Sequence, residues 1–506
     1  MKHIDTNALL SAIAGFCIIL LFTHHGGIGV SPDSVVYTSV ARNIYHHHQL
    51  EAYNHMPLVD FPVFYPVFLS VSMFVSGLDP VVSGPVLNGL LFGLLIYLCG
   101  VAFRKSSSSV TARWALYLSL IISPALLNVY TMLWSETLFI VLSMVLLLLT
   151  HKYCQKTSLT VLIGMAVCAG LACITRYAGI TLIATGGFII LFRLNTPLRK
   201  RIGHTLLFGC LSSAFLLANL LRNAQITGTF TGEREKGITP FFTNMYYYGT
   251  VLCDWLSFLK GHYQGATLLA IASLLLSAIL LIRHLFRPVS HGAMHNIALA
   301  FFFIYTLFIV VSSTISRYEQ INNRLLSPAF APLLLVVIYS LSTLPERFSH
   351  IRKTYLLVPL ALMFILFQAS QVQISKSMYN EYNHYGIPGY TQDSWRHSPV
   401  TQHIQNHPNL FKPGTTIYSN AQEAVYFTTG LAAKSLPHTI DTQDVETFAK
   451  TNEHYLIRYN EVNDTDLVSM PFITAHKKLT PLYTATDGVI YSCTLQKANN
   501  SEHDHP

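Results

Sequence analysis

Asp33 stands in the segment SPDSVVYTSVARNIYHHH, directly after a proline and ahead of apolar residues that recur at helical spacing. Ser31 is a good N-cap residue and Pro32 suits the first helical position, so a short helix is predicted to begin here. Asp33 then falls in the first helical turn, where the helix dipole favours an ionised carboxylate. Such a carboxylate either stabilises the helix start or accepts a proton as a general base.

Few other ionisable residues could do chemistry, because charged residues make up only 11% of the chain. Glu136 in WSETLF opens a predicted helix, so the helix dipole alone would explain a carboxylate there. Asp60 and three arginines stand in other short polar stretches. The arginines are Arg176 in TRYAG, Arg317 in SRYEQ and Arg324 in NNRLLSP. An arginine beside an apolar run can also extend its charged end to lipid head groups, which is the alternative to a role in a site.

Long apolar runs must position these residues, since they recur from residue 8 to residue 370 and 51% of the chain is hydrophobic. A transmembrane helix needs roughly 20 mostly apolar residues, so these runs predict about eleven spans. The spans are expected near residues 8–23, 83–103, 111–130, 137–150, 159–174, 178–192, 202–221, 265–282, 296–313, 325–341 and 354–370. The sequence therefore predicts a mainly α fold, a polytopic membrane helical bundle.

Basic residues gather in every second loop, as the positive-inside rule predicts for cytoplasmic loops. These residues are Arg104, Lys105, Lys152, Lys156, Arg193, Arg199, Lys200, Arg201, Arg283, Arg287, Arg347, Arg352 and Lys353. A cytoplasmic N-terminus follows, provided that residues 61–77 form a helix at the outer interface rather than a span. The alternate loops, which hold Asp33 and the other candidates, then lie on the outer face.

The composition changes after the last predicted span, and residues 371–506 are rich in Tyr, Asn, His and Thr. TTIYSN, HYLIRYN and GVIYSCTL alternate like strands, and Asp487-Gly488 predicts a hairpin turn. We therefore expect a transmembrane module over residues 1–371, with a first outer loop at 24–82, and a soluble mixed α/β domain over 372–506 outside the cytoplasm.

Several classes of partner are not supported by the sequence. The net charge of +8 reflects mostly the basic loops of a membrane protein, so we expect membrane lipids and no nucleic acid as partners. Most of the eight cysteines fall inside predicted spans and make no disulfide framework. His46, His47, His48 and His55 crowd the first loop, but successive residues point in different directions on a helix, so solvated histidines are the simpler interpretation.

A resemblance to a known family extends this interpretation. SPD followed by Tyr37, then a Phe-Pro and a Tyr-Pro, is similar to the first outer loop of the GT-C membrane glycosyltransferases. The resemblance is to the family that includes protein O-mannosyltransferases and lipid A aminoarabinose transferases. WSETLF, TRYAG and NNRLLSPAFAP resemble later segments in the same order. The aminoarabinose transferases have Glu-Lys-Pro in the first loop, whereas Asp60, Phe61 and Pro62 stand here without the lysine, so that particular activity is not implied.

The resemblance implies an inverting transfer of a sugar from a polyprenyl-phosphate donor, in which Asp33 takes the acceptor's proton as general base.

 The donor is expected to be a sugar on undecaprenyl phosphate, and the acceptor a lipid, a glycan or a protein. An acceptor hydroxyl attacks the anomeric carbon, Asp33 removes its proton, and the lipid phosphate leaves. Arginine suits that phosphate because its planar fork donates two hydrogen bonds.

The other candidates take their expected roles from the same resemblance. The donor phosphate is assigned to Arg324, Arg176 and Arg317, and Glu136 is expected to orient the acceptor or help bind a metal. Some members of the superfamily place a divalent metal ion beside the lipid phosphate, so such an ion is a candidate cofactor. Tyr37 and Asp60 are first-loop candidates. The expected location is a bacterial cytoplasmic (inner) membrane.

Two other functions remain open at this point. A transporter or flippase of lipid-linked sugars should place polar residues near the middle of its spans, whereas the spans here are nearly free of ionisable residues. A polymerase or ligase of the O-antigen type is expected to use one large basic outer loop, whereas this chain has an acidic first loop and a C-terminal tail.

Overall fold

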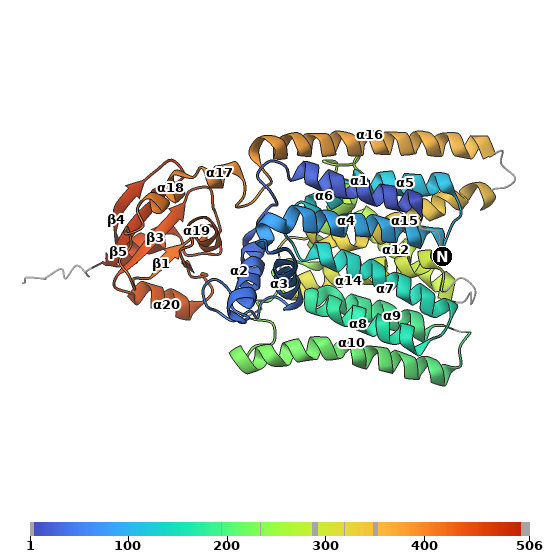
Figure 1. The fold of residues 1–506 in the computed structure, drawn as a ribbon, viewed down its shortest axis with the longest axis horizontal. Helices are drawn as coiled ribbons and strands as arrows, with labels where there is room; N and C mark the ends of the chain where they lie inside the picture. Colours follow the sequence, from blue (N-terminus) through green and yellow to red (C-terminus); the bar gives the residue numbers. More distant parts are fainter. Residues whose placement is uncertain are drawn as a thin grey trace, which may run out of the picture.

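The computed structural model describes residues 5–193, 195–232, 234–285, 292–317, 319–347 and 353–496. It has two parts, a bundle of long helices and a smaller C-terminal domain that lies against one end of the bundle (Figure 1). The start of the chain lies at the other end of the bundle. This arrangement confirms the predicted mainly α bundle with a C-terminal mixed α/β domain.

The helices of the bundle follow the predicted apolar runs, except for α11, which was not predicted. They are α1 (Thr6–Phe22), α4 (Pro80–Arg104), α5 (Val110–Ile121), α6 (Pro124–Tyr130), α7 (Glu136–Gln155), α8 (Leu159–Thr175), α9 (Ile180–Leu191), α10 (Leu198–Thr227), α11 (Phe241–Trp255), α12 (Ala266–Leu285), α14 (Met294–Ile315), α15 (Asn323–Arg347) and α16 (Lys353–Tyr385). Within the described ranges, seven helices are long and apolar enough to cross a membrane, and the bent pair α5 and α6 makes an eighth. The shorter apolar helices α1, α8 and α9 occupy the remaining predicted spans.

Burial separates the centre of the bundle from its edge. In the most apolar window of α7, 67% of the residues are buried inside the protein, against 17% in α10 and 6% in α16. Figure 1 shows α10 and α16 along opposite edges of the bundle. Apolar side chains exposed along whole helices would be unfavourable in water, and they are favourable against lipid chains. The chain is therefore a multi-pass membrane protein.

Two short helices lie at the end of the bundle that faces the C-terminal domain (Figure 1): α2 (Pro32–His47) and α3 (Phe64–Ser76). The start of α2 is a capping box, in which Ser31 and Ser34 each accept a hydrogen bond from the other's backbone N–H. This confirms the predicted helix start with Pro32 at the first position. Arg42 of α2 donates two hydrogen bonds, of 2.6 and 3.1 Å, to Asp79 before α4, so α2 is tied to the bundle.

The C-terminal domain contains a five-stranded sheet in the order β2-β1-β3-β5-β4. The strands are β1 (Ile417–Ser419), β2 (Lys434–Ser435), β3 (His454–Tyr459), β4 (Lys477–Thr484) and β5 (Gly488–Leu495). The three predicted strands are present, and β4 and β5 form the predicted antiparallel hairpin. Five helices accompany the sheet: α17 (Asp393–Arg396), α18 (Pro399–Asn406), α19 (Gln422–Thr429), α20 (Thr442–Lys450) and α21 (Met470–His476). Residues 372–385 continue α16 before this domain begins.

Close backbone contacts fasten this domain to the segment that leads into α2. The N–H of Tyr390 donates to the carbonyl of Val30 at 2.7 Å, and the Thr391 hydroxyl donates to the carbonyl of Ile28 at 2.9 Å. Gly389 has a φ of 122°, and a Cβ there would lie 2.4 Å from the Val30 carbonyl oxygen, so only glycine fits. The C-terminal domain therefore helps to fix the approach to Asp33.

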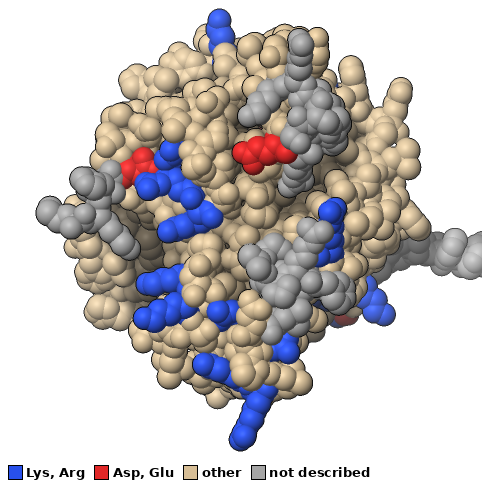
Figure 2. All heavy atoms as spheres, turned by 90° about the vertical axis from the view of Figure 1, so that its right-hand side faces the viewer, with Lys and Arg blue, Asp and Glu red and all other residues tan. Residues whose placement is uncertain are grey.

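The opposite end of the bundle is basic. Figure 2 shows this end, where lysine and arginine side chains outnumber the acidic ones. Asp5 at the start of α1 pairs there with Arg104 at 3.1 Å and Arg113 at 3.2 Å. Arg287 and Arg352, which belong to the predicted basic loops, lie outside the described residues.

Candidate active site

A cavity of about 230 Å³ lies where α2 meets the ends of the spanning helices. Its polar lining includes Asp33 and Asp60 from the first loop, Arg176 at the end of α8, Arg234 after α10, and Arg324 at the start of α15. These residues are up to 291 positions apart in the chain. The fold therefore brings carboxylates and guanidinium groups together at the end of the bundle that carries the C-terminal domain.

The loop before α7 holds the start of α2 in place. Gly29 and Met132 form a β-bridge, in which the N–H of Gly29 donates to the Thr131 carbonyl and the N–H of Leu133 to the Gly29 carbonyl, both at 2.9 Å. The indole of Trp134 donates to the Ser31 hydroxyl at 2.8 Å. Asp33 at the start of α2 is thereby held close to the start of α7.

Arg324 joins the two carboxylates that the sequence singled out. Its Nη2 donates to Asp33 Oδ2, and its Nε donates to Glu136 Oε1 at 2.6 Å. Glu319 lies 3.8 Å from Nη1, and the guanidinium carbon lies 4.4 Å from the centroid of the Trp134 ring. Three carboxylates therefore surround this one guanidinium group, and the tryptophan face adds a cation–π contact.

Glu136 is fully buried and lies beneath the cavity rather than in its lining. Besides Arg324, it contacts Arg176 at 2.7 Å, and Arg176 also donates to the Ser135 hydroxyl at 3.0 Å. An isolated carboxylate would be very costly in this position, and two guanidinium groups offset that cost. Glu136 therefore contacts both arginines from below and does not itself line the cavity.

The structure brings most of the predicted site residues together. Tyr37 lines the cavity together with Asp33, Asp60, Arg176 and Arg324. Arg317 lies elsewhere and forms ion pairs with Glu235 after α10 and Asp466 of the C-terminal domain. These two carboxylates raise the pKa of the Arg317 guanidinium. Arg317 thus ties the C-terminal domain to the loops of the bundle.

Arg234 lines the cavity and was not predicted from the sequence. Its Nη2 donates to the backbone carbonyl of Asp60 at 3.0 Å, and within the described chain it has no ion pair with a carboxylate. Burial raises the pKa of the Asp60 carboxyl, and the Arg234 guanidinium opposes that rise. The charged run GEREKG, between two predicted spans, is the signal that could have drawn attention to this loop, although it does not say which of its charges faces inward.

The carboxylates of the cavity do not fit a metal site. In the described part of the chain, no group of three His, Cys, Asp or Glu side chains could hold a metal ion. Asp33 and Glu136 instead contact guanidinium groups, which would compete with a cation for the same oxygens. We therefore derive no step through a metal ion.

The fold is similar to that of known membrane enzymes, and three solved structures carry the comparison. ArnT from Cupriavidus metallidurans in the apo state is 14% identical over 97% of this chain and 98% of that chain, with a TM-score of 0.60. The same protein bound to undecaprenyl phosphate is 12% identical over 96% of this chain and 98% of that chain, with a TM-score of 0.61.

The third structure is the Archaeoglobus fulgidus oligosaccharyltransferase tethered to an acceptor peptide. It is 12% identical over 96% of this chain and 74% of that chain, with a TM-score of 0.53. No protein-family model and no curated protein matches the sequence. At such low identities the similarity establishes the fold, which is the architecture that the resemblance implied.

Replacing Glu136 with Gln should destabilise the protein, because the arginines at positions 176 and 324 would then share a buried site without their common carboxylate. Breaking a buried ion pair on one side costs about 3–5 kcal/mol. The thermal unfolding midpoint of the purified protein should fall by several degrees. The matched control is Glu453→Gln, which breaks an exposed pair with Lys412. Equal midpoints for the two variants would show that the buried ion pairs of Glu136 do not stabilise the protein more than an exposed pair does.

Proposed function

We propose that this chain is a membrane glycosyltransferase that moves a sugar from a polyprenyl-phosphate donor to an acceptor hydroxyl at the outer membrane surface. The observation that carries the proposal is the cavity in which Asp33 lies beside guanidinium groups, at one end of a GT-C membrane bundle. A lipid-linked donor approaches such a cavity from the bilayer, and a water-soluble or lipid acceptor can approach it from the end of the bundle.

Asp33 is the proposed general base. Arg324 binds Oδ2, whereas Oδ1 has no hydrogen-bond partner among the described residues and the side chain lines the cavity. A base oriented by a third group, with its second oxygen free, is suited to accept a proton as the acceptor oxygen attacks. The new bond forms between that oxygen and the anomeric carbon, the bond from this carbon to the phosphate oxygen breaks, and the configuration inverts.

Arg234 is the best placed group for the departing lipid phosphate. Arg324 is surrounded by three carboxylates that would repel a phosphate, and Arg176 contacts the buried Glu136. Arg234 lines the cavity, and among the described residues its side chain is held by a carbonyl oxygen alone. A guanidinium group without a carboxylate partner can donate two hydrogen bonds to a phosphate, which stabilises the leaving group. The proposed phosphate site is therefore Arg234, with support from Arg176.

Undecaprenyl phosphate is the proposed lipid of the donor, because ArnT, which shares this fold, has been solved with it bound. The charges at the cavity also argue against a transporter. Glu136 is the first residue of α7, Arg324 the second of α15, and Arg176 follows the last residue of α8. Ionisable groups at helix ends leave the middle of the spans apolar, whereas a transport path needs polar groups there.

The membrane orientation follows from the distribution of charge. The basic end shown in Figure 2 is proposed to face the cytoplasm, with the C-terminal domain and the cavity outside.

In this orientation, alkaline phosphatase fused after Asn500 should be active, and the same enzyme fused after Arg201 should be inactive. The reverse pattern would place the cavity on the cytoplasmic side and contradict the proposed access to an external acceptor.

Replacing Asp33 with Asn should lower sugar transfer by a factor on the order of 10² or more, because Asn cannot accept the proton. Asn keeps the size of the side chain, so undecaprenyl phosphate binding should remain. Transfer is measured by complementing a deletion strain, whose accumulated lipid-linked sugar identifies the donor by mass spectrometry. Asp441→Asn at the start of α20 is the matched control and should transfer normally. Near-normal transfer by the Asp33 variant, at equal expression, would leave Asp33 only a helix-start residue.

Replacing Arg234 with Ala should weaken undecaprenyl phosphate binding about tenfold or more, the cost of losing charge-assisted hydrogen bonds. Lys412→Ala removes one positive charge from an exposed pair in the C-terminal domain, outside the cavity, so it should leave the affinity unchanged. Affinities are measured on purified protein by ligand-dependent thermal shift. If the Arg234 variant keeps the affinity of the wild type, the phosphate site lies elsewhere.

A further inference from the structure

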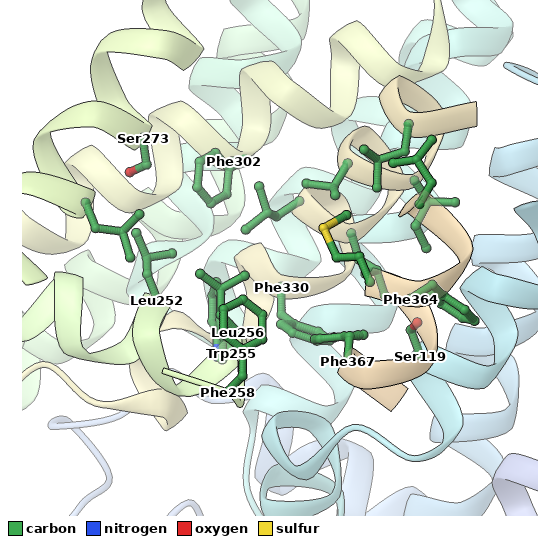
Figure 3. Close-up of a pocket in the computed structure, with 18 residues that line it drawn as sticks. Ser119, Leu252, Trp255, Leu256, Phe258, Ser273, Phe302, Phe330, Phe364 and Phe367 are labelled. Atoms are coloured by element: carbon green, nitrogen blue, oxygen red, sulfur yellow. The ribbon is translucent and has the colours of Figure 1, made fainter. Parts of the chain in front are cut away.

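A second cavity, of about 320 Å³, lies among α5, α11, α12, α14, α15 and α16. Figure 3 shows its lining, which is almost entirely apolar, with the rings of Phe302, Phe330, Phe364 and Phe367 around it. Its polar exceptions are already engaged. The hydroxyl of Ser119 accepts from Gln368 at 2.6 Å, the hydroxyl of Ser273 pairs with Tyr248 at 2.8 Å, and the Trp255 indole bonds Asn323. The cavity therefore suits a hydrocarbon chain.

A polar cavity of about 600 Å³ lies beside the apolar one, and Trp255 lines both. α16 shows the change along its own length. Leu360, Met363 and Phe367 line the apolar cavity, and Gln373, Ser377 and Glu381 line the polar one. Within the described chain, the side chains of these last three residues have no hydrogen-bond partner. Along α16 the lining thus changes from apolar to polar toward the end of the bundle that carries the C-terminal domain.

The charges of the polar cavity differ from those of the catalytic cavity. Its charged groups are two carboxylates, Asp254 and Glu381, and one amine, Lys260. The catalytic cavity instead balances three arginines against three carboxylates, Asp33, Asp60 and Glu319. A net negative lining disfavours a phosphate, whereas amides, hydroxyls and carboxylates with free hydrogen-bonding capacity suit the hydroxyl groups of a sugar.

We propose that these two adjacent cavities form a second lipid site, separate from the catalytic cavity, which binds a membrane glycolipid with an uncharged, hydroxyl-rich head group. The chain lies among the phenylalanines, and the sugar lies beside Gln373, Ser377 and Glu381. The site adjoins the catalytic one through two consecutive residues, since Asn323 lines the polar cavity and Arg324 the catalytic cavity. The indole of Trp255 donates to Asn323 Oδ1 at 2.9 Å, so the occupant would contact the residue that precedes Arg324.

The test uses Trp255, which stands between the two cavities, as a reporter. Purified full-length protein in nanodiscs is titrated with glucosyl diacylglycerol that carries brominated chains, and separately with phosphatidylglycerol that carries the same chains. The fluorescence of Trp255 is obtained as the difference between the wild type and Trp255→Phe. The glucosyl lipid should quench it at a mole fraction about tenfold lower, because its hydroxyls gain hydrogen bonds in the polar cavity. Equal quenching by the two lipids would mean that any membrane lipid fills the two cavities, and it would overturn the proposal.

Ser377→Phe fills the polar cavity and should abolish the preference for the glucosyl lipid. Val372→Phe adds the same ring to an exposed position of the same helix, outside both cavities, and should leave the preference intact. Gln373→Leu, which keeps the volume and removes hydrogen bonds, should weaken the preference even if the larger substitution fails to fold. A preference that persists in Gln373→Leu and in a folded Ser377→Phe protein would also overturn the proposal. Sugar transfer is not measured, so the outcome is independent of the function proposed above.

Discussion

The contact of Arg324 with both Asp33 and Glu136 is the interaction on which the rest of the site depends. A guanidinium group and a fully buried carboxylate are stable at this depth only as partners, since each alone would lose its hydration without compensation. Their fixed geometry joins the starts of α2, α7 and α15, which are distant in sequence. The β-bridge at Gly29 and the capping box at Ser31 then orient Asp33 with respect to that pair.

The membrane explains why this chemistry lies at the ends of helices. The interior of the bilayer offers no water to ionised groups, so charge is concentrated where the spans reach the surface. The same constraint is consistent with the lining of the two adjacent cavities, which changes from phenylalanine to polar side chains along α16. Two cavities of different charge thus adjoin the first turn of α15 from different sides.

The C-terminal domain contributes to this geometry from outside the bundle. Its hydrogen bonds to the backbone at residues 28 and 30 restrain the segment that leads into α2, and the pairs of Arg317 restrain the loop that carries Arg234. Tyr426 of α19 also stacks on Tyr53 of the first loop, with centroids 4.5 Å apart. The C-terminal domain thus contacts the first loop at several points, and these contacts stabilise the conformation of that loop.

The sequence by itself determined the elements and their order. Apolar runs of membrane length fixed the spans, because a helix satisfies its backbone hydrogen bonds within its own segment in lipid, and Ser31 with Pro32 fixed the start of α2 by local capping. It also identified Asp33, Glu136, Arg176 and Arg324 as unusual charges. Only the tertiary structure decided their partners: Glu136 is buried between two arginines, Arg317 pairs with the C-terminal domain, and Arg234 faces the cavity. Capping and hydropathy depend on a few neighbouring residues. An ion pair forms between groups that are distant in sequence and meet only in the folded chain, so local sequence does not show which charges become partners.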